Sequence, residues 1–216
     1  MTENLSNDEG PGRLLAVGDI HGCLAPLQRL MSQVMPTPDD RIVFLGDYID
    51  RGPDSAGVID YLLDLAGQGP ESIFLRGNHE QMFLDYLDGA DPSLFLVNGG
   101  LMTLNSYRAA GRWPLPAEHR SFLDSTHQYF ATESFIFVHA GLRPGVALRD
   151  QKTSDTLWIR GEFLASDYDW GKTIVFGHTP QEQPLISAHR LGLDTGCVYG
   201  RQLTCCDVRS GQIWQA

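Results

Sequence analysis

The chain has 216 residues, of which 42% are hydrophobic and 20% are charged, enough for a single sizeable core. Its 16 basic and 27 acidic residues give a formal charge of −11, which repels nucleic acid and anionic lipid at long range. No apolar run approaches the roughly 18 residues of a membrane span, so we expect a cytoplasmic protein with no nucleic-acid and no membrane partner.

The first part of the chain alternates strand-like and helix-like segments. Residues 1–13 are polar and predict a frayed tail, and the absence of a linker predicts one domain over 1–216. The apolar runs that predict strands are 14–17, 42–45 and 72–75, and the segments with helical periodicity between and after them are 24–34, 53–67 and 82–87. Strand–helix–strand order is typical of parallel pairing through right-handed crossovers. The sequence therefore predicts an α/β fold.

The rest of the chain has a less regular pattern of apolar residues. Residues 88–133 predict a mainly helical insert beside the site, for which pure packing and substrate contact are equally weighted. Apolar runs at 135–138 and 173–176 predict two further strands. Short strand-like pieces after residue 180, separated by Gly, Pro and Ser, favour antiparallel hairpins.

Each of the five predicted strands ends in a loop that carries metal-binding side chains. The candidate donors are Asp19, His21, Asp47, Asn78, His139 and His178. Strands of one sheet would bring these loops to one edge. Oxygen and imidazole donors without thiolate suit Mn²⁺, Fe²⁺ or Zn²⁺, and six donors suit two metals that share a carboxylate. Asp47 is the expected bridge because it lies on the central loop of the series.

Each donor also has an ordinary structural interpretation. A lone His is more often a packed core residue, and Asn78 before a helix is normally an N-cap. These interpretations would have to hold independently at all five loops. We therefore favour a shared metal site.

The loops resemble a known family in their amino-acid sequences and in their order along the chain. The motifs are Gly-Asp-Ile-His-Gly at 18–22, Gly-Asp-Tyr-Ile-Asp-Arg-Gly at 46–52, Arg-Gly-Asn-His-Glu at 76–80, His-Ala-Gly at 139–141 and Gly-His-Thr at 177–179. This series resembles the phosphoprotein phosphatase family of metallophosphoesterases, and the length resembles its compact bacterial and phage branch. The segments Asn98-Gly99-Gly100 and Leu193-Asp194-Thr195-Gly196 fit the same branch.

The resemblance implies the calcineurin-like fold, in which two mixed β-sheets pack as a sandwich flanked by helices. It also implies two divalent metal ions, for which we expect Mn²⁺, with Fe²⁺ and Zn²⁺ as alternatives. Asp19 and His21 would bind the first ion, Asp47 would bridge, and Asn78, His139 and His178 would bind the second. No regulatory subunit is expected for so short a chain.

The expected reaction is hydrolysis of a phosphate ester by a hydroxide that bridges the two metals. Arg51, and by resemblance Arg76 and Arg160, would hold the phosphoryl oxygens through their planar guanidinium groups. His79 would act as general acid on the leaving oxygen, with Asp50 accepting its other N–H. For Arg51 and Arg160 the alternative is a salt bridge to a loop acid, and for Asp50 it is a cap of its own turn.

Three functions follow from these residues. The leading hypothesis is a serine/threonine protein phosphatase acting on phosphorylated proteins. The first alternative is a symmetrical dinucleoside polyphosphate (diadenosine tetraphosphate) hydrolase; those enzymes typically read Gly-Asn-His-Asp, whereas this chain has Glu80. Trp113 or Tyr107 could stack a base in that case. A catalytically silent phosphate-binding module ranks last because all six ligands, His79 and Asp50 are present.

Overall fold

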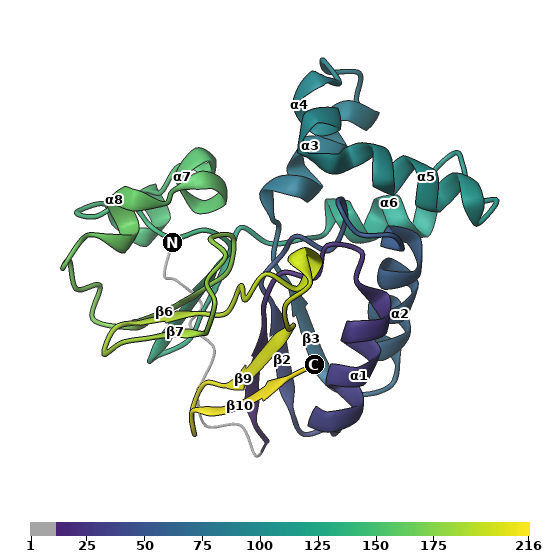
Figure 1. Ribbon diagram of the computed structural model, residues 1–216. Helices are drawn as coiled ribbons and strands as arrows, with labels where there is room; N and C mark the ends of the chain where they lie inside the picture. The colour runs from purple at the N-terminus through teal and green to yellow at the C-terminus, as the bar shows by residue number, and fades with distance from the viewer. Residues whose placement is uncertain (1–11) are drawn as a thin grey trace.

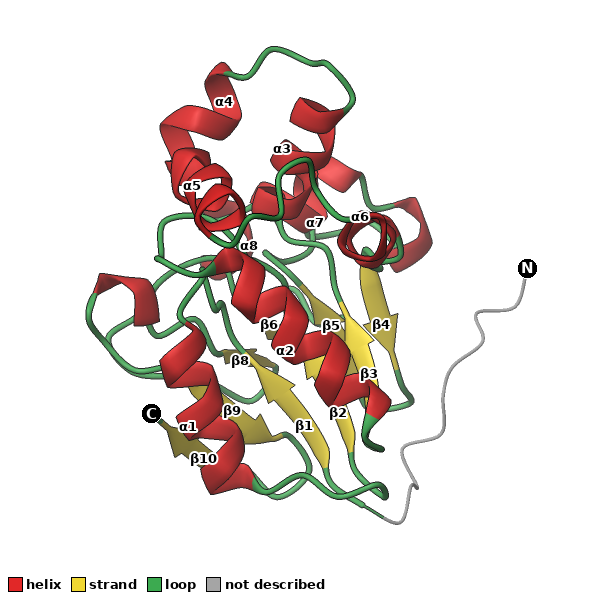
Figure 2. Ribbon diagram, turned by 90° about the vertical axis from the view of Figure 1, so that its right-hand side faces the viewer, coloured by secondary structure: helices red, strands yellow, loops and turns green. Residues whose placement is uncertain are grey.

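A computed structural model describes residues 12–216 as two five-stranded sheets packed face to face with helices outside them (Figures 1 and 2). The first sheet has the order β10-β9-β1-β2-β3, with strands β1 Leu14–Val17, β2 Arg41–Phe44, β3 Glu71–Phe74, β9 Thr204–Asp207 and β10 Gln212–Gln215. The second sheet has the order β4-β5-β6-β8-β7, with strands β4 Tyr129–Ala131, β5 Phe135–Val138, β6 Thr173–Phe176, β7 Leu185–Ile186 and β8 Arg190–Gly192. The predicted α/β fold with two mixed sheets is confirmed.

The pairing within each sheet is partly parallel and partly antiparallel. Strands β1, β2 and β3 are parallel to one another, as are β5, β6 and β8. The hairpins expected near the C-terminus add antiparallel strands, with β9 against β1 and β10, and β7 against β8. Consequently the predicted strand ends gather at one end of the sandwich.

Strand β1 is apolar throughout because both of its faces are buried. Leu14 and Ala16 of β1 pack between the sheets, whereas Leu15 and Val17 pack under the helices. Successive strand residues point to opposite faces, so a strand covered on both sides has no polar alternation. Figure 2 shows α1 (Leu24–Val34) and α2 (Ser55–Gly67) over the first sheet.

The remaining helices lie beyond the ends of the strands or over the second sheet. They are α3 Asn78–Leu87, α4 Ser93–Phe95, η1 Leu96–Gly100, α5 Leu101–Ala109, α6 Ala117–Asp124, η2 Leu148–Asp150, α7 Thr153–Trp158, α8 Gly161–Leu164 and η3 Cys197–Tyr199. Figure 2 shows α3 to α6 at the end of the molecule toward which β1 and β3 point. Within residues 12–216, no helix is both long and apolar enough to cross a bilayer.

Two details differ from the sequence-based expectations. The insert over 88–133 is not wholly helical, because Tyr129–Ala131 forms β4 at the edge of the second sheet, antiparallel to β5. Of the predicted tail 1–13, residues 1–11 lie outside the described part. Arg13 is not frayed, since its guanidinium bonds both carboxylate oxygens of Asp40 at 3.1 and 2.6 Å.

Candidate metal and phosphate site

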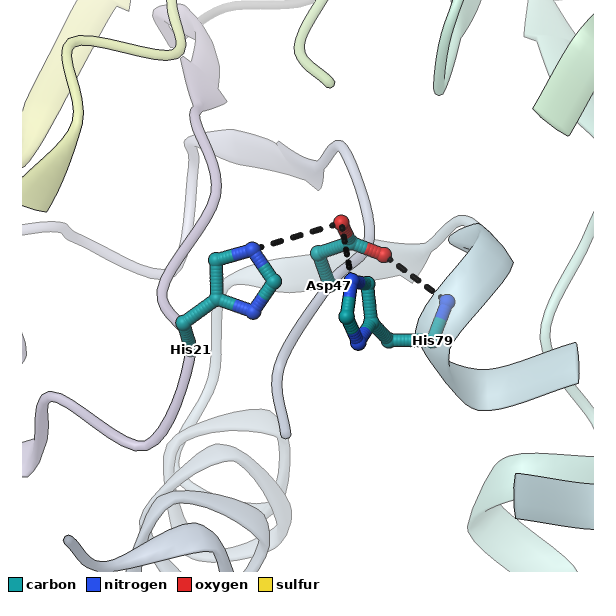
Figure 3. Close-up of side chains that lie close together, drawn as sticks. All are labelled: His21, Asp47 and His79. Carbon is teal, nitrogen blue, oxygen red and sulfur yellow. Dashed lines mark hydrogen bonds and ion pairs between the residues drawn. The ribbon is translucent and has the colours of Figure 1, made fainter. Parts of the chain in front are cut away.

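Asp47 lies at the centre of a cluster of buried imidazoles. Its Oδ2 is 3.4 Å from His21 Nε2, and its Oδ1 is 3.4 Å from His139 Nε2. Two groups of donor atoms, each within 4.8 Å of one another, share this carboxylate: one is His21, Asp47 and His79, the other Asp47, His139 and His178. Figure 3 shows the first group, with both rings turned toward the Asp47 carboxylate.

Hydrogen bonds fix two of these rings in a form that can bind a metal. The Nδ1 atoms of His21 and His139 each lie 2.8 Å from a backbone carbonyl, of Ile49 and Leu45 respectively. Only an N–H can bond a carbonyl, so each Nε2 presents a lone pair to Asp47. A carbonyl on the far ring nitrogen is the usual support of a metal-binding His. Both rings are therefore oriented as ligands.

The acceptors of the second group face one another without a proton between them. His139 Nε2 is 3.0 Å from Asn78 Oδ1, and His178 Nε2 is buried with no hydrogen-bond partner. Burial lowers the pKa of His178 to about 2, which keeps the ring neutral. Buried acceptors that converge without a donor fit a cation.

Asp19 contacts the site through the backbone of His178. Its carboxylate accepts the backbone N–H of His178 at 3.0 and 3.1 Å, and it belongs to neither close group. A Cβ on Gly177 would lie 2.1 Å from Asp19 Oδ1. Only glycine therefore lets the backbone of this turn come so close to the Asp19 carboxylate. Burial, together with Asp194 and Asp47, raises the pKa of Asp19 well above its usual range. Such crowded buried acids need positive charge nearby.

Asp194 is a site residue that the list of strand-end donors missed. It is 5% exposed, and burial raises its pKa to about 6. Asp194 lies in the Leu193-Asp194-Thr195-Gly196 segment, whose only signal in the sequence is its family likeness. The backbone carbonyl of Leu193 lies against Gly18, which places this segment next to the Asp19 loop.

His79 and Asp50 form the predicted pair. His79 Nδ1 lies 2.6 Å from Asp50 Oδ2, and both side chains are fully buried. His79 Nε2 has no hydrogen-bond partner and lies 3.9 Å from Asp47 Oδ2. Burial opposes protonation of the ring, but Asp47 and Asp50 outweigh it and raise the pKa of His79. This nitrogen faces the same space as the metal-binding donors.

At several site residues the backbone adopts left-handed conformations that residues other than glycine rarely take. The site residues with φ between 48° and 71° are His21, Asp47, Asp50, Arg51 and His178. Among residues 12–216, the only other non-glycine residue with positive φ is Met35, at the end of α1. Such conformations cost about 1–3 kcal/mol each and persist where surrounding contacts impose them.

Glu80 holds the Asp47 loop in place. Its Oε2 accepts the backbone N–H groups of Asp47 and Gly77 at 2.8 and 2.9 Å, and its Oε1 accepts that of Tyr48 at 2.8 Å. The side chain is fully buried, and both of its carboxylate oxygens are engaged by these backbone donors rather than directed at a substrate. Glu80 therefore separates the two predicted substrate classes only through the shape of this loop.

The three predicted phosphate-binding arginines lie in different places. Arg51 reaches His21 Nε2 with a guanidinium nitrogen at 2.9 Å, and exposed Arg160 reaches the Thr179 hydroxyl, next to His178, at 3.4 Å. Arg76 points away from the site. Its guanidinium bonds Thr126, Gln81 and the carbonyls of Leu123 and Asp124 at the end of α6. The expectation that Arg76 holds phosphate is wrong, because its donors are engaged there.

The aromatic residues considered for base stacking are also placed differently. Tyr107 is fully buried and bonds His119 Nδ1 through its hydroxyl, and Trp113 packs against the helical core. The buried Tyr107 ring cannot stack on a ligand at the site, and the Trp113 ring has Arg108 Cζ 5.8 Å from its centroid. Exposed Tyr199 and Trp158 lie there instead, with Arg51 Cζ 5.9 Å from the Tyr199 ring and the His178 ring 6.1 Å from that of Trp158.

Comparison with known proteins agrees with this architecture. The family model for the calcineurin-like phosphoesterases matches residues 12–206, and the chain belongs to this family. The resemblance to the phosphoprotein phosphatase branch is confirmed by a relative that is 34% identical over 212 residues. That relative is serine/threonine-protein phosphatase 1 of Salmonella typhimurium, and the match covers 87% of this chain and 88% of the relative.

Other relatives carry a different activity in their names. The asymmetrical bis(5'-nucleosyl)-tetraphosphatase PrpE of Bacillus thuringiensis is 27% identical, with 87% of each chain covered. A solved structure described as a candidate diadenosine tetraphosphatase superposes with a TM-score of 0.79 at 25% identity, covering 98% of this chain and 96% of that one. The protein is thus a metallophosphoesterase with a candidate two-metal site, and the relatives described above are named for two substrate classes.

Proposed function

We propose that the protein is a two-metal phosphomonoesterase that removes phosphate from phosphoserine and phosphothreonine in proteins. The observation that carries this proposal is the position of Asp47 between two groups of imidazoles, with the His79–Asp50 pair directly beside it. The relative with 34% identity, a serine/threonine-protein phosphatase, supports the choice of substrate.

The donor set supports an assignment of ligands to two cations. His21, with Asp19 on the same loop, would hold one cation, and Asn78, His139 and His178 the other, with Asp47 between them. Mn²⁺ suits such oxygen and imidazole ligands, as do Fe²⁺ and Zn²⁺. When bound, two such cations supply an acidified water as nucleophile and neutralise charge on the phosphoryl group.

The protein side chains would bind the phosphoryl group and protonate the leaving oxygen. Arg51 and Arg160, which stand beside His21 and Thr179, would bind phosphoryl oxygens and orient phosphorus. His79 Nε2 would give its proton to the leaving oxygen, while Asp50 holds the Nδ1–H and favours the protonated ring.

The test is a substrate panel with one metal-loaded preparation. We expect kcat/KM to be higher for a phosphothreonine peptide than for a phosphotyrosine peptide or diadenosine tetraphosphate, with nitrophenyl phosphate as the reference. A preference for the phosphotyrosine peptide or the dinucleotide would overturn the assigned substrate. Activity that survives complete chelation would overturn the two-metal reaction itself.

A second candidate function is hydrolysis of dinucleoside polyphosphates. Tyr199 and Trp158 favour it, because exposed rings beside Arg51 and His178 could stack on nucleobases while phosphates occupy the site. The tetraphosphatase relatives favour it as well. Under this function, Tyr199→Leu should lower kcat/KM for diadenosine tetraphosphate about tenfold, as loss of one stacked base predicts, and leave the phosphothreonine peptide nearly unchanged.

A further inference from the structure

The helical insert reaches the catalytic pair through one buried side chain. The Thr103 hydroxyl of α5 donates to Asp50 Oδ1 at 2.6 Å and accepts the backbone N–H of Asp50 at 2.9 Å. It also lies 3.0 Å from the Ser55 hydroxyl. Because the single Thr103 hydrogen goes to Asp50, Ser55 must be the donor in that last contact. The hydroxyl thus uses its donor and both lone pairs.

These bonds decide where the other oxygen of Asp50 points. Oδ2 meets His79 Nδ1 at 2.6 Å only while Oδ1 stays toward α5. Asp50 is fully buried, so no solvent could replace a lost bond to Oδ1. The direction of the carboxylate, and through it the orientation of the His79 ring, therefore depends on Thr103.

The same insert also contacts the residue that follows Asp50. The backbone N–H of Arg51 donates to the Gly99 carbonyl at 3.3 Å. Asp50 and Arg51 are consecutive left-handed residues, with φ of 71° and 65°. A strained pair of this kind persists only when its surroundings impose it. Thr103 and Gly99 of the insert supply that restraint together with Ser55 of α2, whose hydroxyl also accepts the Asp50 N–H, at 3.1 Å.

We propose that Thr103 is a positioning residue that holds the Asp50–Arg51 turn and aims Asp50 at His79. This inference rests on the proposed phosphomonoesterase function and gives the insert a role beyond packing and substrate contact: it orients the reacting groups. Thr103 acts through Asp50 and has no contact of its own with the metal-binding donors.

The first measurement is kinetic. Thr103→Val keeps the shape of the side chain and removes all three hydrogen bonds, whereas Thr103→Ser keeps the hydroxyl. We expect T103V to lower kcat for a phosphothreonine peptide about tenfold more than for nitrophenyl phosphate, whose leaving group needs no proton. T103S should restore both rates to within about threefold of the wild type, which a purely packing role of the threonine methyl would not allow.

Ser106 offers a matched control on the same helix. Its hydroxyl accepts the backbone N–H of Ala56 at 3.0 Å and donates to Asp54 at 3.3 Å, so it also ties α5 to α2 but touches neither Asp50 nor Arg51. Ser106→Ala should leave the ratio of the two rates unchanged. An equal change of that ratio in S106A and T103V would overturn the proposal.

The second measurement does not depend on activity. In a crystal structure of T103V we expect the Asp50 carboxylate to rotate and its contact with His79 Nδ1 to lengthen. An unmoved Asp50 would overturn the proposal whatever the kinetics show. If T103V does not fold, T103A takes its place with the same expectations.

If His79→Asn slowed both substrates equally, the acid role of His79 would fail, yet a displaced Asp50 would still establish the positioning role.

Discussion

His79 Nδ1 and Asp50 Oδ2 lie 2.6 Å apart with both side chains removed from solvent. His79→Asn removes the acid and should lower kcat for alkyl phosphates about 10²-fold or more, because general acid catalysis contributes 10²–10⁴. Nitrophenyl phosphate should lose much less, since its leaving group needs no proton. The measurement is kcat for both substrates with the same metal. An equal loss would remove His79 from this role.

Asp47 is shared by both donor groups, whereas His178 belongs to one. Asp47→Ala should therefore abolish tight binding of both cations, and His178→Ala that of only one. Metal content per chain after dialysis measures the difference. Chelation should also lower the melting temperature of the wild type, because a ligand that binds only the folded state stabilises it. Equal metal content in the two variants would contradict the shared role of Asp47.

Glu80 accepts three backbone N–H groups of the Asp47 and Gly77 turns. Glu80→Ala leaves these donors buried and unpaired, so the free energy of unfolding should fall by about 3 kcal/mol or more. Urea denaturation measures it. The control is Glu162→Ala, which removes an exposed carboxylate paired with Arg143 and should change stability by less than about 1 kcal/mol. Similar losses in both variants would argue against a special role of Glu80.

Asp40 links stability to pH at the end of the sandwich where β1 begins. Burial alone would raise the pKa of Asp40, but bonds from Arg13 and Thr37 outweigh it and hold the pKa well below its usual range. The stabilisation is therefore complete above the unfolded pKa of about 3.9 and is lost as pH falls toward the folded pKa.

Asp40→Asn should accordingly lower the melting temperature at pH 7, and the difference from the wild type should shrink below about pH 4. Thermal unfolding across this range measures the effect. A difference that stays constant down to pH 3 would show that packing rather than charge makes the contribution.

Arg51 and Arg76 should differ in what their loss affects. Arg51→Ala should raise KM and lower kcat about tenfold or more for all phosphate esters, because the Arg51 guanidinium beside His21 would hold the phosphate. Arg76→Ala should leave KM unchanged and lower stability, because its guanidinium bonds the end of α6. Steady-state kinetics and denaturation of both variants make the comparison, and a raised KM in R76A would contradict it.

Most of the fold could be predicted from the sequence because its strands are short, apolar and followed by glycine-bounded loops. The run 135–138 matches β5 residue for residue. Strand β4 was missed because Tyr129–Ala131 has three residues at the edge of a sheet and no periodicity of its own. Its pairing with β5 is a tertiary contact that local pattern cannot supply.

The site divides in the same way. Residue type and loop position were sufficient to place Asp47 among the imidazoles, but they could not tell the direction of long side chains. Arg76 and Arg51 both follow strands, and only the packing of α6 turns Arg76 away. Thr103 could not be predicted, because an ordinary helical threonine carries no signal until the turn it supports is known.

The order of the donors along the chain also bears on when the site can form. Asp19 and His178, which meet through a backbone hydrogen bond, are separated by 159 residues. Pairings this distant close slowly and late in folding. A chain emerging from the ribosome would therefore carry incomplete sets of donors for most of its synthesis, and cation capture would belong to the last steps of its maturation.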